Sequence, residues 1–162
     1  MDDLRALLDD ARSRLADVPR ESTGGLVEPG RVKRAIGVRP RIVRVGEVWR
    51  LGVLLLGDDG VWATGEVLRA AEEVRRGYPA ESQRRRAEVR AMAFRGGFAE
   101  GETFHIGWAP VDVAAVADGG DDGPLSWDHG TLMVRWSPAG FFRPLAPYLS
   151  EQIGLLRRPG DG

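Results

Sequence analysis

The residue types of a nucleophilic triad occur together once, as Ser126, Asp128 and His129 in the run SWDHG. A triad works when different segments of the fold bring the three side chains into contact. Here all three fall within one short turn, and the sequence has no G-x-S-x-G elbow to present a serine. We therefore interpret SWDHG as the polar turn of a hairpin, because Ser, Asp and Gly favour turns.

Metal and thiol chemistry have little support. The chain has no Cys, which excludes disulfides, thiolate nucleophiles and Cys-ligated zinc. Its two histidines, His105 and His129, have no ligand-motif spacing to each other or to Asp112 and Asp128. The acidic run DGGDDG lacks the spacing and the closing Glu of a calcium loop. We expect no metal and no cofactor.

An anion site is the most specific binding chemistry that the residues suggest. Arg75, Arg76 and Tyr78 come just before a predicted helix N-terminus, where free amides and the helix dipole favour anions. These three residues are our candidate site for a phosphate or carboxylate. The alternative is a solvated helix face with internal ion pairs, because the helix then alternates acids with basic residues: Glu81, Arg84, Arg85, Arg86, Glu88 and Arg90.

A pocket, if one exists, is expected near His105 and Trp108. These residues lie where a predicted strand over residues 102–108 ends before Pro110. Strand ends and the loops that follow them carry sites more often than strand middles do.

The elements that must position these groups are organised around residues 47–70, the most apolar run of the chain. Residues 48–56 alternate like a strand, and Asp58-Asp59-Gly60 then predicts a three-residue hairpin loop with a bulge at Gly60. That register sets three pairs opposite each other across the hairpin: Leu55 with Ala63, Val53 with Gly65, and Leu51 with Val67.

The second face of this hairpin is too apolar for simple exposure. Leu54, Leu56 and Trp62 lie on it, so either the chain's own helices or a second subunit must cover it. We take these three residues as the candidate interface of a homodimer, with cover by the chain's own helices as the alternative.

The remaining patterns predict helices, strands and loops in turn. A helix starts near Leu4, with Asp2 or Asp3 as its cap, and ends before Pro19. Further elements follow in order: a loop at 21–30, a short strand at 32–38, a strand at 41–45, a helix from 81 to Gly96, a short helix at 111–117, a hairpin over 125–136, and a helix over 145–156. We predict one α+β domain, 1–162, with a mostly antiparallel sheet built on two hairpins and about three helices packed on it.

Composition sets the class of protein. The 162 residues are 43% hydrophobic and 29% charged, which is typical of globular proteins. The net charge of −1 gives no overall attraction to nucleic acid or membrane, so we expect neither as a partner. No apolar core follows a basic start, so we expect no signal peptide and a cytoplasmic location.

Two runs, RIVRVGEVWRLGVLLLGDDGVWATGEVLRA and AESQRRRAEVRAMAFRGGFAEGE, resemble a family of small, uncharacterised actinobacterial proteins, some of which carry an automated "glutaminase" label. The resemblance covers most of the chain and implies no established catalytic residues. Serine-dependent glutaminases resemble penicillin-binding enzymes in using Ser-x-x-Lys. The only Lys is Lys33, and Gly30 stands three residues before it, so that motif is absent.

The preferred function is therefore a non-enzymatic binding or interaction module that forms a homodimer. The alternative is a small hydrolase or transferase, which would include amide hydrolysis, acting on an anionic metabolite. Arg75, Arg76 and His105 would contribute to such a site.

Overall fold

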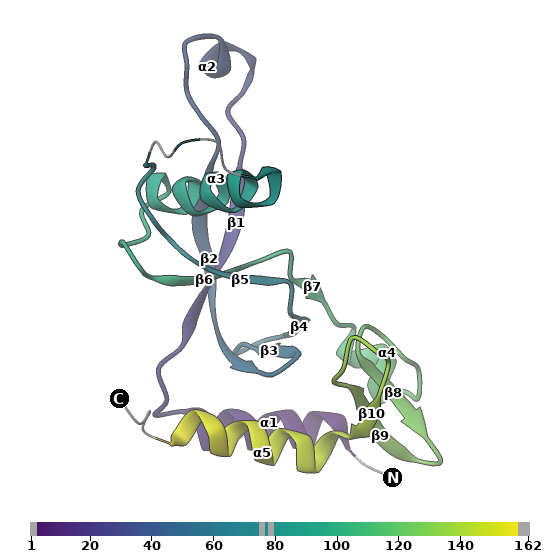
Figure 1. Ribbon diagram of the computed structural model, residues 1–162. Coiled ribbons are helices and arrows are strands. Elements are labelled where there is room, and N and C mark those ends of the chain that lie inside the picture. Colours follow the sequence, from purple (N-terminus) through teal and green to yellow (C-terminus); the bar gives the residue numbers. More distant parts are fainter. Residues whose placement is uncertain (1–2, 75–76, 78–79, 159–162) are drawn as a thin grey trace. The chain divides into compact units, whose positions relative to one another are not determined.

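The structure is a computed structural model that describes residues 3–74, 77 and 80–158 (Figure 1). Within these residues it has five helices: α1 (Leu4–Leu15), α2 (Arg31–Ala35), α3 (Glu81–Arg95), α4 (Val113–Ala117) and α5 (Leu145–Arg157). The strands are β1 (Glu21–Val27), β2 (Arg41–Leu51), β3 (Leu54–Leu56), β4 (Val61–Ala63), β5 (Glu66–Arg69), β6 (Thr103–Ile106), β7 (Ala109–Pro110), β8 (Leu125–Asp128), β9 (Thr131–Arg135) and β10 (Phe142–Pro144). The α+β class is confirmed.

Contacts divide the chain into two compact units. Unit 1 comprises Met1–Arg20, Val48–Gly65 and Gly107–Gly162, and unit 2 comprises Glu21–Glu47 and Glu66–Ile106. Strand order is β2-β3-β4-β7 in unit 1 and β5-β6-β1-β2 in unit 2, so β2 contributes residues to both. A second sheet of unit 1 has the order β10-β9-β8. Most pairs are antiparallel, as expected, but β1 and β6 run parallel.

Helices α1 and α5 supply much of the core of unit 1. The helix predicted to start near Leu4 is confirmed as α1, and its aliphatic side chains at helical spacing are buried: Leu4, Leu8, Ala11 and Leu15. Asp3 caps this helix, as its carboxylate accepts a hydrogen bond from the amide of Ala6. The final helix buries Leu145, Tyr148, Leu149 and Ile153 against the same core.

The central hairpin differs from the prediction. Residues 48–56 are not one strand, because the chain reverses at Gly52, whose φ of +62° is easy only for glycine. Strands β2 and β3 then pair through Leu51 with Leu54 and Trp49 with Leu56. The hydroxyl of Tyr148 accepts a hydrogen bond from the Val53 amide at 2.9 Å and so holds this turn.

The β3–β4 hairpin exists, but its predicted register is wrong by one residue. Leu55 pairs with Trp62 rather than Ala63, and Leu54 pairs with Ala63. The amide of Gly57 donates to the carbonyl of Gly60, so the loop holds two residues rather than three. Val67, expected opposite Leu51, pairs with His105 in unit 2.

Two further predictions, both for segments of unit 2, are wrong. Residues 21–27, expected as a loop, form β1, which pairs with β6 through Thr23 and His105. Residues 32–38, expected as a strand, contain the short helix α2 instead. The helix predicted from residue 81 to Gly96 is confirmed as α3. A side chain at Gly96 would meet the Ile42 carbonyl oxygen at 1.6 Å, so glycine lets the end of α3 lie directly on β2.

Two further predictions for unit 1 are confirmed. The hairpin expected over residues 125–136 forms from β8 and β9, with His129 and Gly130 in the turn. The short helix expected at residues 111–117 is α4. The description as two hairpins with about three helices is therefore too simple, because the structure adds α2 and a third strand, β10, beside β9.

Candidate functional site

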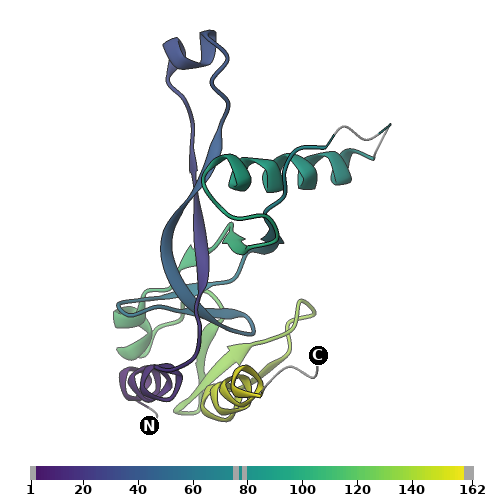
Figure 2. The same ribbon diagram turned by 90° about the vertical axis from the view of Figure 1, so that its left-hand side faces the viewer.

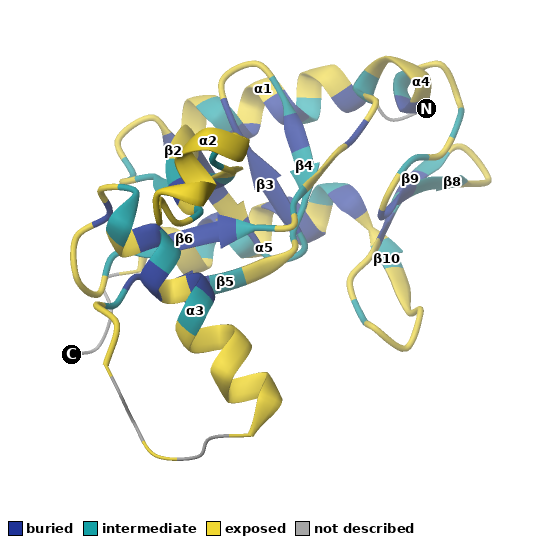
Figure 3. Ribbon diagram, turned by 90° about the horizontal axis from the view of Figure 1, so that it is seen from above, coloured by how far each residue is buried: buried dark blue, intermediate teal, exposed yellow. Residues whose placement is uncertain are grey.

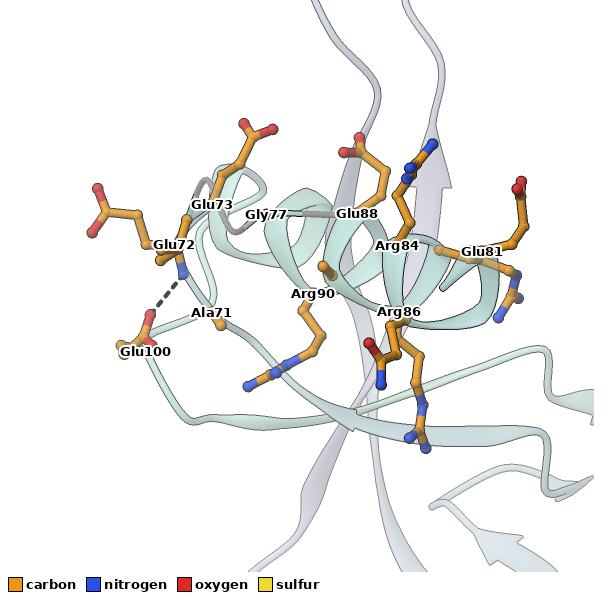
Figure 4. A pocket seen from close by; sticks show the side chains of 14 residues that line it. Ala71, Glu72, Glu73, Gly77, Glu81, Arg84, Arg86, Glu88, Arg90 and Glu100 are labelled. Carbon is orange, nitrogen blue, oxygen red and sulfur yellow. Dashed lines mark hydrogen bonds between the residues drawn. The ribbon is translucent and has the colours of Figure 1, made fainter. Parts of the chain in front are cut away.

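The predicted anion-binding residues Arg75, Arg76 and Tyr78 lie outside the described residues. The described residues on either side of them line a cleft of about 1030 Å³ beside α3 (Figure 4). Its polar lining mixes both signs of charge, with Glu72, Glu73, Glu81, Glu88, Glu100, Arg84, Arg85, Arg86 and Arg90.

Several of these charges are already neutralised. Arg85 donates two hydrogen bonds to the Glu66 carboxylate, which lower the pKa of Glu66 and raise that of Arg85. Arg90 donates to the Arg69 carbonyl oxygen at 2.7 Å. Arg39 pairs with Glu73 at 2.7 Å, and this hydrogen bond raises the pKa of Arg39. The alternative interpretation, a solvated helix face with ion pairs, accounts for Arg85 of α3.

Arg84 and Arg86 differ from their neighbours. Both are exposed cations on the first two turns of α3 and line the cleft. Within the described ranges, neither has an ion pair or a hydrogen bond through its guanidinium. Figure 4 shows both on α3, while Glu72, Glu73 and Glu100 lie together on the far side of the cleft. Glu81 and Glu88 of α3 also line the cleft, so an anion bound here would meet acidic as well as basic side chains.

The predicted pocket residues, His105 and Trp108, belong to different units. His105 is fully buried in unit 2, where its Nε2 lies 3.1 Å from a Glu21 carboxylate oxygen. Its Nδ1 is also buried and has no hydrogen-bond partner among the described residues. Trp108 belongs to unit 1 and packs edge-on against Trp62 with ring centroids 6.3 Å apart. Neither residue lines the cleft beside α3.

The residues of SWDHG form a hairpin turn, as predicted. His129 has a side chain that is 96% exposed, and its Nδ1 lies 2.5 Å from an Asp128 oxygen. Ser126 lies along β8, opposite Met133. Among the described residues, no three His, Asp or Glu side chains are placed to hold a metal ion.

Two residues of the predicted dimer interface are buried. Leu54 and Leu56 are each 1% exposed and belong to the core of unit 1, so their own chain covers them (Figure 3). Trp62 is half-buried against Trp108. Both leucines belong to one buried cluster with Leu8 of α1 and Tyr148 of α5.

The most exposed apolar surface of unit 2 was missed by the sequence analysis. Residues 26–41, which we call the arm, join β1 to β2 through α2. Figures 1 and 2 place α2 at the end of the arm, away from α3 in the same unit. Val32 is 78% exposed and Ile36 75% exposed. Figure 3 shows α2 exposed along its length.

The signal for this surface was present in the sequence but ambiguous. Val32, Ile36 and Val38 fall at even spacing, which is typical of a strand, so we interpreted them as one. Val32 and Ile36 are also four residues apart, which places them on one face of a helix. Pro29-Gly30 just before Arg31 is compatible with either element.

Comparisons with protein-family models, with curated proteins and with solved structures find no match to this chain. Across the described residues, no helix combines the length and the apolar character needed to cross a membrane. The site must therefore be interpreted from its own geometry.

Proposed function

We propose that this chain is an interaction module that docks through the arm, residues 26–41. One observation carries the proposal: the arm has five exposed aliphatic side chains, Leu26, Val27, Val32, Ile36 and Val38. Single exposed aliphatic residues are ordinary, but a group of them on one segment marks an interaction surface.

The arm is also suited to contact because its own fold does not use these side chains. No residue of α2 is buried, and none of the five belongs to either hydrophobic core among the described residues. Folding is therefore supported by the core around Phe104 and Phe98, and the arm's sequence is free to serve binding.

A photo-cross-linking residue at position 35 tests this proposal in cells of the organism that encodes the chain. Ala35 lies on exposed α2, and the control, Ala114, is an exposed residue of α4 in unit 1. We expect covalent adducts from position 35 and not from position 114, with mass spectrometry giving the class of the partner. Equal adducts at the two positions, or none at 35, would contradict docking through the arm.

We also propose that the chain forms a homodimer. Its interface would not include Leu54 and Leu56, because both are buried. Light scattering coupled to size-exclusion chromatography measures it directly. A mass of one chain, 17.7 kDa, would remove the dimer, whereas twice that mass would support it. A cytoplasmic location is compatible with either result.

Binding of a small anion is a second candidate function. The observation that favours it is the pair Arg84 and Arg86, which line the cleft and have no guanidinium hydrogen bond or ion pair among the described residues. Thermal-shift measurements with phosphate and with citrate provide the test, since a ligand that binds the native state raises Tm. We expect the increase to disappear in R84Q/R86Q and to persist in the control R5Q, where Arg5 is an exposed cation of α1.

The alternative of a hydrolase or transferase, including amide hydrolysis, has weaker support. It would need a general acid or base within reach of the anion site. The imidazole of His105 is buried beside Glu21 in unit 2. His129 lies on a hairpin turn of unit 1. Turnover of glutamine or of another amide by the purified chain would favour this alternative over the interaction module.

A further inference from the structure

The arm combines its aliphatic side chains with an excess of positive charge. Residues 26–41 contain five basic residues, Arg31, Lys33, Arg34, Arg39 and Arg41, and one acidic residue, Glu28. The net charge of the whole chain is −1, so the rest of the chain is acidic on balance. The net charge of the whole chain argued against an anionic partner, but the charge of this segment is positive.

Three of these cations are free to meet a partner. Arg39 is held by Glu73, and Arg34 lies 3.8 Å from Glu28. Arg31, Lys33 and Arg41 are exposed and have no ion pair among the described residues. Arg31 and Lys33 are the chain neighbours of Val32 on α2, so the same short exposed helix carries both apolar and cationic side chains.

This arrangement matches an anionic lipid bilayer. Aliphatic side chains at an exposed tip can enter the boundary between headgroups and acyl chains, and nearby Lys and Arg attract anionic lipids. We propose that the arm docks on the surface of anionic membranes, with Val32 and Ile36 inserted and Arg31, Lys33 and Arg41 at the headgroups. This inference rests on the proposed function and names the partner of the same surface.

Other occupants fit the arm less well. A symmetric contact between two arms would bring like charges together, which is unfavourable. Single-stranded nucleic acid is bound through aromatic side chains that stack on bases, and residues 26–41 contain no aromatic residue. An acidic protein with an apolar groove shares the required chemistry, and the experiment below separates it from a membrane.

The test is co-sedimentation of the full chain with vesicles of phosphatidylcholine alone or with 30% phosphatidylserine. We expect binding only to the anionic vesicles, and weaker binding as NaCl rises, because salt screens surface charges. Absence of binding to anionic vesicles at low salt would overturn the proposal. Equal binding to both compositions would overturn the role of the cations.

Paired variants separate the two contributions. V32S/I36S removes the aliphatic groups without changing charge, and we expect at least a tenfold loss of affinity. R31Q/K33Q removes two charges, with an expected loss of roughly thirtyfold from the usual contribution of a basic residue at such a surface. The control L155S changes an exposed leucine of α5 in unit 1 and should bind like wild type. Circular dichroism confirms that each variant is folded.

The results also distinguish the inference from the proposed function. If vesicles fail to bind while the cross-linker at position 35 yields a protein adduct, the membrane proposal is wrong and docking through the arm stands. If vesicle binding survives both arm variants but is lost in W136A/F141A, another surface binds the membrane. Trp136 and Phe141 form an exposed stacked pair in unit 1 that makes this control informative.

Discussion

Tyr148 shows how much one side chain of α5 determines in unit 1. Its hydroxyl accepts from the Val53 amide and lies 3.4 Å from the Leu51 carbonyl oxygen, on either side of the Gly52 turn. Tyr148→Phe leaves the amide without its partner, so we expect the free energy of unfolding to fall by about 1–2 kcal/mol. Urea denaturation measures this change.

Ser150→Ala is the matched control on the same helix. Its hydroxyl is exposed and only receives a hydrogen bond from Arg14, so its loss should change stability by less than about 0.5 kcal/mol. An equal effect of the two substitutions would show that Tyr148 does not hold the turn.

Asp17 and Arg157 predict a pH dependence. The hydrogen bond from Arg157 lowers the pKa of Asp17 below its usual value of 3.8. The stabilisation is therefore present above the unfolded-state pKa and is lost as pH falls through the lower folded-state pKa. In Arg157→Met, NMR titration should find the Asp17 pKa closer to 3.8. An unchanged pKa would contradict the pairing, and high salt should weaken the shift in wild type.

The β8–β9 hairpin is an element that the sequence predicted well, because its turn chemistry is local. His129 has a φ of +47° and Gly130 a φ of +79°, as a two-residue turn of this kind requires. His129→Asn should keep stability, since Asn tolerates this conformation. His129→Val should lower stability by about 1–2 kcal/mol, because a β-branched side chain clashes there. Thermal unfolding of both variants checks the difference, and equal Tm values would contradict it.

The central hairpin was harder because its local signal points to the wrong structure. Trp49, Leu51, Val53 and Leu55 alternate as one strand should, and nothing in that pattern marks Gly52 as a turn. The turn depends on Tyr148, which is about a hundred residues away and not visible to local reasoning. Leu54 and Leu56 are buried in the core of their own chain, so these two residues are not exposed for the interface predicted there.

The prediction for the arm was wrong because its local signal is ambiguous. Its local pattern allowed both a strand and a helix, and its function depends on exposure, which only the fold reveals. Similarly, no pattern in the sequence indicates that His105 would be buried beside Glu21, since that contact joins β6 to β1. Local signals predicted the helices and the second hairpin, but long-range pairing decided the candidate site.

The two units have separate cores, and this separation can be tested. Phe104 lies in the core of unit 2 and Leu132 in that of unit 1, and both are fully buried. Phe104→Ala should cost about 3–5 kcal/mol and Leu132→Ala about 2–5 kcal/mol. Hydrogen exchange should show lost protection mainly at residues 21–47 and 66–106 for the first substitution, and in the remaining segments for the second. Equal loss everywhere for both would indicate a single cooperative core.

Docking of the arm on anionic membranes is the central claim, and one labelled position tests it most directly. The chain has no Cys, so Ala35→Cys places a single environment-sensitive fluorophore on α2 between Val32 and Ile36. With anionic vesicles, we expect its emission to shift to the blue and its quenching by iodide to fall, whereas the same label at Ala114→Cys stays unchanged. No change at position 35, or the same change at position 114, would contradict the account.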